Sequence, residues 1–195
     1  MSTLDALLAA VALKHQPRAG WLRTGLVHAP RAVESVAAHS WGVAYLVLAL
    51  LPPELDRAKA LTFAVLHDLP EALTGDITPH DGISRSEKHA REDAACQTLT
   101  APMGPNLYTT WQQYERQQCA ESQFVKQLDK LDMALQALHY TEEHGVDTRE
   151  FMASAAAGIT HPVLVDLMDA IADRASPEGP PQRTAHPESD GDHGQ

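Results

Sequence analysis

The sequence has few cysteines, few aromatic residues and no long hydrophobic run. Its 195 residues include 2 cysteines, Cys96 and Cys119, which lie far apart and lack the CxxC spacing of a zinc knuckle. Neither a disulfide framework nor a cysteine-based zinc site is therefore indicated, and a reducing cytoplasm is favoured. The longest apolar run, from Val43 to Leu51, is under half the length that a membrane-spanning helix needs. No basic residue precedes the apolar stretch from Leu7 to Leu13, which argues against a secretory signal. We expect a cytoplasmic protein with no membrane partner.

Positive charge is also scarce. The chain carries 15 lysines and arginines against 26 aspartates and glutamates, for a formal net charge of -11 at pH 7. Because such a field repels phosphate groups, we expect no nucleic-acid polymer and no anionic membrane surface as a partner. A small anionic substrate would need a local region of positive charge, and a bound cation would supply one.

The residues that are abundant favour helices. Hydrophobic residues make up 44% of the chain, and the many alanines and leucines suit helices that pack closely through small side chains. The length is sufficient for one domain with a sizeable core. We predict an all-α fold, a single helical bundle over residues 1–175. Residues 176–195 contain proline, glycine, serine and charge without a large aliphatic residue, so we predict a disordered tail there.

Capping residues, prolines and apolar spacing predict where the helices lie. Ser35 can cap one helix, and Ser84 with Glu87 resembles a capping box that begins another. The clearest amphipathic pattern begins at Phe124 and ends near Gly145. Prolines and glycines interrupt residues 17–30, which we expect to form a long functional loop. The predicted helices are 4–14, 35–51, 55–68, 71–73, 84–99, 106–119, 124–145, 148–157 and 162–173.

Four side chains within these helices could share a cation. The adjacent pair His67-Asp68 ends an otherwise apolar helix, which alone is equally compatible with a polar helix terminus. His39 lies inside an apolar helix and Asp129 on the amphipathic one, and each would be costly to bury alone. A shared cation would offset these costs. Two imidazoles and two carboxylates suit a divalent Mn, Co, Fe, Zn or Mg ion, and such an ion makes hydroxide available near neutral pH.

Five motifs follow one another between about Leu4 and Glu143. They are Lys14-x-x-Pro17-Arg18-x-Gly20-Trp21, Glu34-Ser35-Val36-Ala37-x-His39-Ser40, His67-Asp68-Leu69-x-Glu71-Ala72, Gly75-Asp76-Ile77-Thr78-Pro79-x-Asp81-Gly82 and Lys126-x-x-Asp129-Lys130. In this order they resemble the motifs of the HD-domain 5'-deoxynucleotidases. The resemblance implies an all-helical, typically dimeric enzyme that removes phosphate from deoxynucleoside 5'-monophosphates with a divalent metal. It implies metal ligands at His39, His67, Asp68 and Asp129.

The resemblance also implies roles for the residues around the metal. Arg18 matches a phosphate-contacting arginine, and Trp21 an aromatic residue that packs against the base or sugar, although the residue pattern is equally compatible with a core position for Trp21. Glu71 matches the residue that manages the attacking water, with Asp76 beside it. In some members Glu71, Asp76 and the following carbonyl, here that of Ile77, hold a second metal. The substrate-binding set then comprises Arg18, Trp21, Asp68, Asp76, Ile77, Thr78, Pro79 and Asp129.

Two departures from the family pattern and one neighbouring carboxylate qualify this assignment. Pro70 follows the His67-Asp68 pair where small residues are usual, and bacterial members carry adjacent Arg and Trp, which leaves base placement open. Asp132 lies three residues after the candidate ligand on the same helix. For it we expect a solvated or salt-bridged role rather than support of the site.

Other functions are compatible with the same motifs. The site motifs barely separate a monophosphate hydrolase from a deoxynucleoside triphosphate triphosphohydrolase, which would convert deoxyadenosine triphosphate to deoxyadenosine and triphosphate. A non-catalytic nucleotide- or metal-sensing module is a further alternative, although such a binder would need neither Glu71 nor Asp76. Hydrolysis of a deoxynucleoside 5'-monophosphate by a homodimer is the function that we expect.

Overall fold

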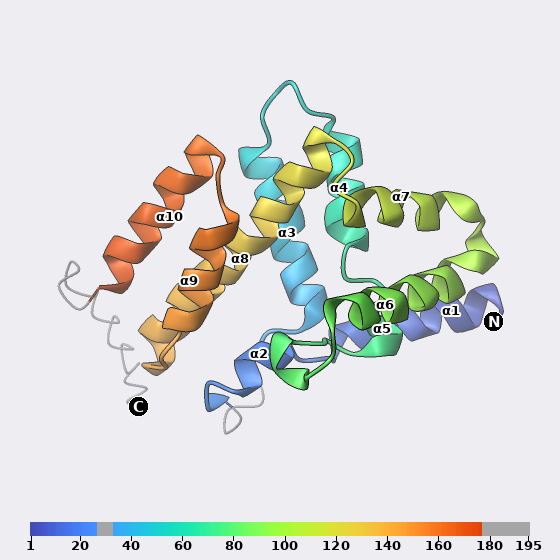
Figure 1. The fold of residues 1–195 in the computed structure, drawn as a ribbon, viewed down its shortest axis with the longest axis horizontal. Helices are drawn as coiled ribbons and strands as arrows, with labels where there is room; N and C mark the ends of the chain where they lie inside the picture. Colours follow the sequence, from blue (N-terminus) through green and yellow to red (C-terminus); the bar gives the residue numbers. More distant parts are fainter. Residues whose placement is uncertain (27–32, 177–195) are drawn as a thin grey trace, which may run out of the picture.

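The computed structural model describes residues 1–26 and 33–176, and every regular element within these ranges is a helix. The predicted all-α fold class is confirmed for this part of the chain. The elements, drawn in Figure 1, are α1 (Thr3–Val11), η1 (Ala12–Lys14), α2 (Ala19–Leu22), α3 (Val36–Leu50), α4 (Arg57–Leu66), α5 (Glu71–Thr74), η3 (Pro79–Asp81), α6 (Arg85–Thr100), η4 (Ala101–Met103), α7 (Pro105–Glu115), α8 (Ala120–His144), α9 (Arg149–Gly158) and α10 (Pro162–Ala175).

Side-chain caps fix the start of several helices. Ser2, Ser35, Asp56 and Ser84 each accept a hydrogen bond from the backbone amide three residues later. Such caps satisfy amides that have no partner in the first helical turn. At the other end of α8, Gly145 has a φ of 63°, a left-handed conformation that glycine adopts readily. The predicted caps at Ser35 and Ser84 and the predicted end near Gly145 are confirmed.

The long helix α8 lies at the centre of the fold. Helices α3 and α4 pack against α8, and α9 and α10 pack against it elsewhere, so that all five share the main hydrophobic core (Figure 1). Helices α1, α5, α6 and α7 form the group at the right of Figure 1, and α7 joins that group to α4 and α8. This arrangement brings the beginning of α3, the end of α4 and the middle of α8 into one region.

Some boundaries differ from the predicted ones. The predicted helix 4–14 is divided into α1 and η1, and the predicted loop contains the short helix α2. The predicted helix 106–119 ends at Glu115, because Gln117 adopts a φ of 51° that interrupts the helix, and Cys119 instead precedes α8 as its N-cap. The predicted disordered tail lies, beyond Ser176, outside the described residues. In the described ranges, no helix combines the length and the apolar character required to cross a membrane.

Candidate metal centre

The four predicted metal ligands meet where α3, α4 and α8 converge. His39 is on α3, His67 and Asp68 directly follow α4, and Asp129 is on α8. The Nε2 atom of His39 lies 3.2 Å from Nε2 of His67 and 3.2 Å from Oδ1 of Asp129. Oδ2 of Asp68 lies 3.2 Å from Nε2 of His67 and 3.7 Å from Nε2 of His39. The fold therefore brings together residues that are far apart in the sequence.

Each imidazole already has a hydrogen-bond partner on its other nitrogen. Nδ1 of His39 is 2.8 Å from Oδ2 of Asp132, and Nδ1 of His67 is 2.8 Å from the carbonyl oxygen of Ala64. The carbonyl and the ionised carboxylate are acceptors, so Nδ1 carries the proton and a neutral ring presents a lone pair at Nε2. Two such nitrogens only 3.2 Å apart, next to carboxylate oxygens, favour a positive charge between them, which a proton on His39 or a cation in its place supplies. This donor set fits a divalent cation.

The electrostatics of the ligands agree with that requirement. His39 is 0% exposed and Asp129 is 7% exposed. Burial and Arg18 lower the pKa of His39, but hydrogen bonds to Asp129 and Asp132 outweigh them and raise it to about 9. Burial opposes ionisation of Asp129, yet Lys126 and His39 hold its pKa well below the usual range. Both shifts favour anionic carboxylates around a positive charge.

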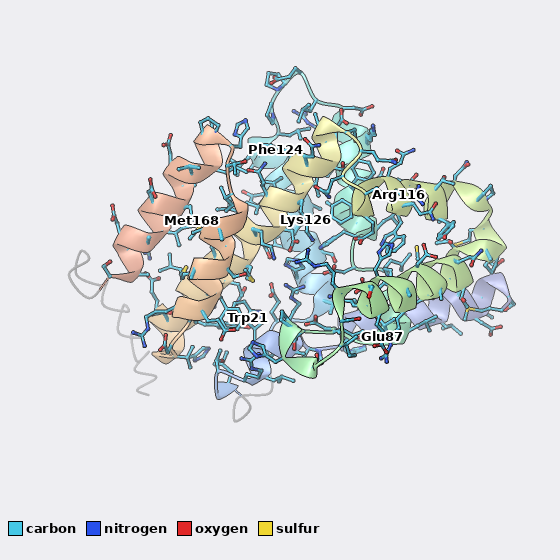
Figure 2. All side chains as sticks on the ribbon, in the orientation of Figure 1. Trp21, Glu87, Arg116, Phe124, Lys126 and Met168 are labelled. Atoms are coloured by element: carbon cyan, nitrogen blue, oxygen red, sulfur yellow. The ribbon has the colours of Figure 1, made fainter. Side chains whose placement is uncertain are left out.

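Two basic side chains adjoin the ligands. Nη1 of Arg18 is 3.2 Å from Oδ2 of Asp68, and Nζ of Lys126 is 3.0 Å from Oδ2 of Asp129. Figure 2 labels Lys126 on α8, at the centre of the molecule. The guanidinium has five N–H donors, so Arg18 retains donors for an anion while it contacts Asp68. These residues give an acidic chain the local positive charge that an anionic substrate requires.

Glu71 and Asp76 lie beside the cluster rather than within it. Among the described residues, two groups have ligand atoms that all lie within 4.8 Å of one another, namely His39, His67 and Asp129, and Glu34, His39 and Asp132. Asp68 is in neither group, but its Oδ2 adjoins the first one, 3.2 Å from Nε2 of His67. Oε2 of Glu71 is buried without a hydrogen-bond partner, and Oδ2 of Asp76 accepts a hydrogen bond from the Ala19 amide at 2.7 Å. Burial, reinforced by the Asp68 and Asp76 carboxylates, raises the pKa of Glu71 well above its usual range. A carboxyl group with such an affinity for a proton is suited to general acid–base work.

The predicted substrate loop packs against α6. The side chain of Ile77 is buried, and its carbonyl oxygen accepts a hydrogen bond from Nζ of Lys88 at 2.8 Å. Oγ1 of Thr78 accepts a hydrogen bond from the His80 amide at 3.3 Å, and Pro79 begins the helical turn η3. The Ile77 carbonyl, which the family resemblance assigns to a second metal, is thus engaged with a lysine in this structure.

Trp21 occupies a core position. Its side chain is 2% exposed, with the Phe151 ring centroid 4.1 Å away and the Tyr140 ring edge-on at 5.2 Å (Figure 2 labels Trp21). Nε1 donates a hydrogen bond to Oε2 of Glu34 at 3.0 Å. Residues of α8 and α9 cover the Trp21 ring, so the ring has no exposed face that could pack against a base or sugar.

Two residues on α8 contact the candidate ligands in ways that the sequence did not predict. Asp132 was expected to be solvated or salt-bridged to a neighbouring lysine, but it is 9% exposed and its partner is the His39 ring. Lys126 pairs with the candidate ligand Asp129. Lys126 and Asp132 each lie three residues from Asp129. Because this spacing places side chains on one helix face, the sequence contained a signal that both lie near Asp129.

Comparisons with known proteins identify relatives of this architecture. Residues 10–171 match the family model described as HD domain. The 5'-deoxynucleotidase HDDC2 of Xenopus laevis is 38% identical over 165 residues, which are 82% of this chain and 80% of that protein. The 5'-deoxynucleotidase HDDC2 of Homo sapiens is 36% identical over 173 residues, covering 86% of this chain and 83% of that protein. A solved structure of a protein from Pyrococcus horikoshii OT3 has a TM-score of 0.72 and 30% identity, covering 89% of this chain and 99% of that one.

Proposed function

Given that this chain belongs to the HD-domain family, we propose that it is a divalent-metal-dependent 5'-deoxynucleotidase, which hydrolyses deoxynucleoside 5'-monophosphates to deoxynucleosides and phosphate. The relatives named 5'-deoxynucleotidases align over most of their own length, which supports this substrate class. The observation that carries the proposal is the 3.2 Å approach of the His39 and His67 Nε2 atoms beside two carboxylates.

The metal would be held by His39, His67, Asp68 and Asp129. Imidazole nitrogens and carboxylate oxygens are ligands for Mn, Co, Mg, Zn or Fe, and such sites leave coordination positions for water and substrate. A cation bound there would polarise the phosphate and lower the pKa of its water, to about 7 in the best-known zinc enzymes. Titration of metal-free protein with each ion would identify the one bound most tightly and would count a second ion held by Glu71, Asp76 and the Ile77 carbonyl.

The neighbouring side chains supply binding and proton transfer. Arg18 grips the phosphate through its planar set of donors. The water oxygen attacks phosphorus, the bond between phosphorus and O5' breaks, and the leaving O5' takes up one proton, which balances the proton that the water loses to Glu71. Glu71 accepts the proton of the water in its ionised form, which the positive charge of the filled site and of Arg18 favours. Asp76 orders the segment, since its bond to the Ala19 amide joins the residue after Arg18 to the loop.

The loop that continues from Asp76 would face the sugar. Ile77, Thr78 and Pro79 follow directly, and the Ile77 carbonyl is anchored to Lys88. A fixed backbone at this position could distinguish a deoxyribose from a ribose by leaving little room for the 2'-hydroxyl.

The free thiols of Cys96 and Cys119 are compatible with the reducing cytoplasm that we propose as the compartment.

We propose that the active form is a homodimer. Helices α1 and α3 each expose several large apolar side chains, among them Leu4 (65%) and Leu8 (60%) on α1, and Trp41 (71%) and Tyr45 (57%) on α3. The Trp41 and Tyr45 rings stack with centroids 5.8 Å apart, so they present one continuous aromatic surface. Exposed apolar surface of this kind is typical of subunit contacts. Light scattering coupled to size-exclusion chromatography should give twice the chain mass, and Trp41→Glu should reduce it to the monomer.

The function is tested with protein stripped of metal and then supplied with Mn, Co, Mg or Zn. Phosphate and triphosphate release are measured from a panel of deoxy- and ribonucleoside mono- and triphosphates, with His67→Ala in parallel. We expect metal-dependent phosphate release from deoxynucleoside monophosphates that is lost in the variant. Release of triphosphate from a deoxynucleoside triphosphate would instead identify a triphosphohydrolase, and tight metal binding without turnover would identify a sensing module.

A further inference from the structure

The His39 ring lies between two carboxylates of α8. Its Nε2 atom is 3.2 Å from Oδ1 of Asp129, and its Nδ1 atom is 2.8 Å from Oδ2 of Asp132. These aspartates lie three residues apart, so both project from the same face of α8. Only Asp129 is needed as a metal ligand, which leaves the buried carboxylate of Asp132 to be explained.

Gly42 on α3 provides the space for that carboxylate. It lies three residues after His39, on the same helix face. A Cβ atom at Gly42 would lie 2.1 Å from Oδ1 and 2.9 Å from Cγ of Asp132, which is closer than non-bonded atoms approach. Any side chain at position 42 would therefore displace the carboxylate from its present position.

The local sequence of α3 makes this glycine informative. Glycine is among the least favourable residues in a helix interior, and Gly42 lies within the 15-residue helix α3. It has no φ that requires glycine, and the space that it leaves is filled by the Asp132 side chain. The contact with Asp132 thus accounts for a residue that helix formation alone would disfavour.

We infer that Gly42 and Asp132 form a positioning pair that fixes the tautomer and orientation of His39 for metal binding. The bond from Nδ1–H to the Asp132 carboxylate leaves the Nε2 lone pair aimed at the other ligands. An anionic acceptor also makes the imidazole a stronger donor to a cation. The inference rests on the metal site of the proposed function and adds two residues that do not touch the substrate.

The test measures Co²⁺ affinity by calorimetry and the visible spectrum of the Co²⁺-loaded protein, neither of which depends on turnover. We expect Asp132→Ala to weaken Co²⁺ binding by about 10- to 100-fold and to change the spectrum, because the His39 ring is no longer fixed. Asp132→Asn keeps an acceptor oxygen without the charge, so it should recover part of the affinity. Glu143→Ala, an exposed acidic position on the same helix, should bind Co²⁺ as the unaltered protein does.

The glycine is tested in combination with the aspartate. We expect Gly42→Ala alone to weaken Co²⁺ binding about as much as Asp132→Ala does. The double variant Gly42→Ala/Asp132→Ala should bind Co²⁺ no more weakly than Asp132→Ala, because the new methyl group then occupies the space that the carboxylate has left. Gly158→Ala, at the end of α9, where a Cβ would meet only the flexible Lys130 side chain at 3.1 Å, is the control for adding alanine.

The outcomes separate the possible failures. Co²⁺ affinities of Asp132→Ala and Gly42→Ala that match the unaltered protein, or losses that add in the double variant, would overturn the inference. Should Asp132→Ala not fold, the isosteric Asp132→Asn decides, because an affinity and spectrum equal to those of the unaltered protein would show that the charge of Asp132 is not needed. Failure of the unaltered protein to bind Co²⁺ would contradict the metal site and hence the proposed function itself.

Discussion

Glu71 combines burial with an oxygen that has no partner within the protein. One oxygen lacks a hydrogen bond, and the pKa is raised by burial and by the neighbouring carboxylates. A buried polar atom without a hydrogen-bond partner destabilises the folded protein. The position of Glu71 is therefore better explained by a role in holding a proton than by a contribution to stability.

Glu71→Gln preserves the size of the side chain and removes its ability to accept a proton. We expect kcat for deoxynucleoside monophosphates to fall by about 10²- to 10⁴-fold, the usual contribution of general acid–base catalysis, with little change in KM. Steady-state kinetics at saturating metal measure both constants. The control is Glu92→Gln, another buried carboxyl, on α6, which should retain the kcat of the unaltered protein. Equal kcat values for the two variants would remove Glu71 from the mechanism.

Arg18, for which we propose a phosphate-binding role, also contacts Asp68. Arg18→Ala should lower kcat/KM by about 10- to 100-fold, because a hydrogen bond to a charged group contributes about 1.5–3 kcal/mol. Arg18→Lys should not restore the activity, since an ammonium group cannot make the planar two-point contact. Calorimetric Co²⁺ titration of both variants shows whether the loss comes from substrate or from metal binding. A loss explained entirely by weaker metal binding would contradict the phosphate-binding role.

Among the helices, α7 supports the turn that carries two of the ligands. The Trp111 ring is buried, and its Nε1 atom donates a hydrogen bond to the carbonyl oxygen of His67 at 3.1 Å. This bond satisfies a carbonyl at the end of α4 that lacks a helical partner. Helix α7 therefore fixes the backbone of the ligand pair from outside the ligand cluster.

Trp111→Phe should destabilise the protein by about 1–2 kcal/mol, because the His67 carbonyl remains buried without a donor. For a chain of this length the midpoint of thermal unfolding should fall by about 2–8 °C. Tyr108→Phe on the same helix removes a hydroxyl that contacts the half-exposed Asp93, and it should cost less. If the two variants unfold at the same temperature, the bond to His67 contributes nothing specific.

The elements differ in how far the sequence predicted them. Helices with strong local signals were predicted well, since Ser35, Ser84 and Gly145 act on their own neighbours. The short helix α2 and the division between α1 and η1 were not predicted, because one or two helical turns produce little apolar periodicity.

The site residues show the same contrast between what motifs along the chain predict and what depends on contacts between distant helices. The four candidate ligands were identified through motifs, and the structure brings them together. The partner of Asp132 could not be predicted, because it depends on how α3 and α8 pack, and that contact joins residues 93 positions apart. The sequence could not decide between a core position and a base-packing role for Trp21 for a similar reason, since its neighbours Tyr140 and Phe151 are distant in the sequence.

At the scale of the whole molecule, the candidate ligand cluster joins three helices of the main hydrophobic core. Its members come from α3, from the segment after α4 and from α8. A cation held by all of them would stabilise the folded chain but not the unfolded one, in which these residues are far apart.

Removal of metal should therefore lower thermal stability. At a free metal concentration of about 100 times Kd, binding adds about 2.7 kcal/mol, which corresponds to an increase of about 5–10 °C in the unfolding midpoint. Differential scanning calorimetry of stripped and Mn²⁺-loaded protein measures the shift. His67→Ala should show almost none, and an equal shift in that variant would place the bound ion elsewhere.

The order of the ligands along the chain has a consequence for biosynthesis. His39, His67 and Asp68 leave the ribosome well before Asp129, which lies midway along α8. Because α3 and α4 pack against α8, the candidate ligands can come together only after α8 has been translated and has packed against both helices. Metal loading would therefore follow the folding of the central helix.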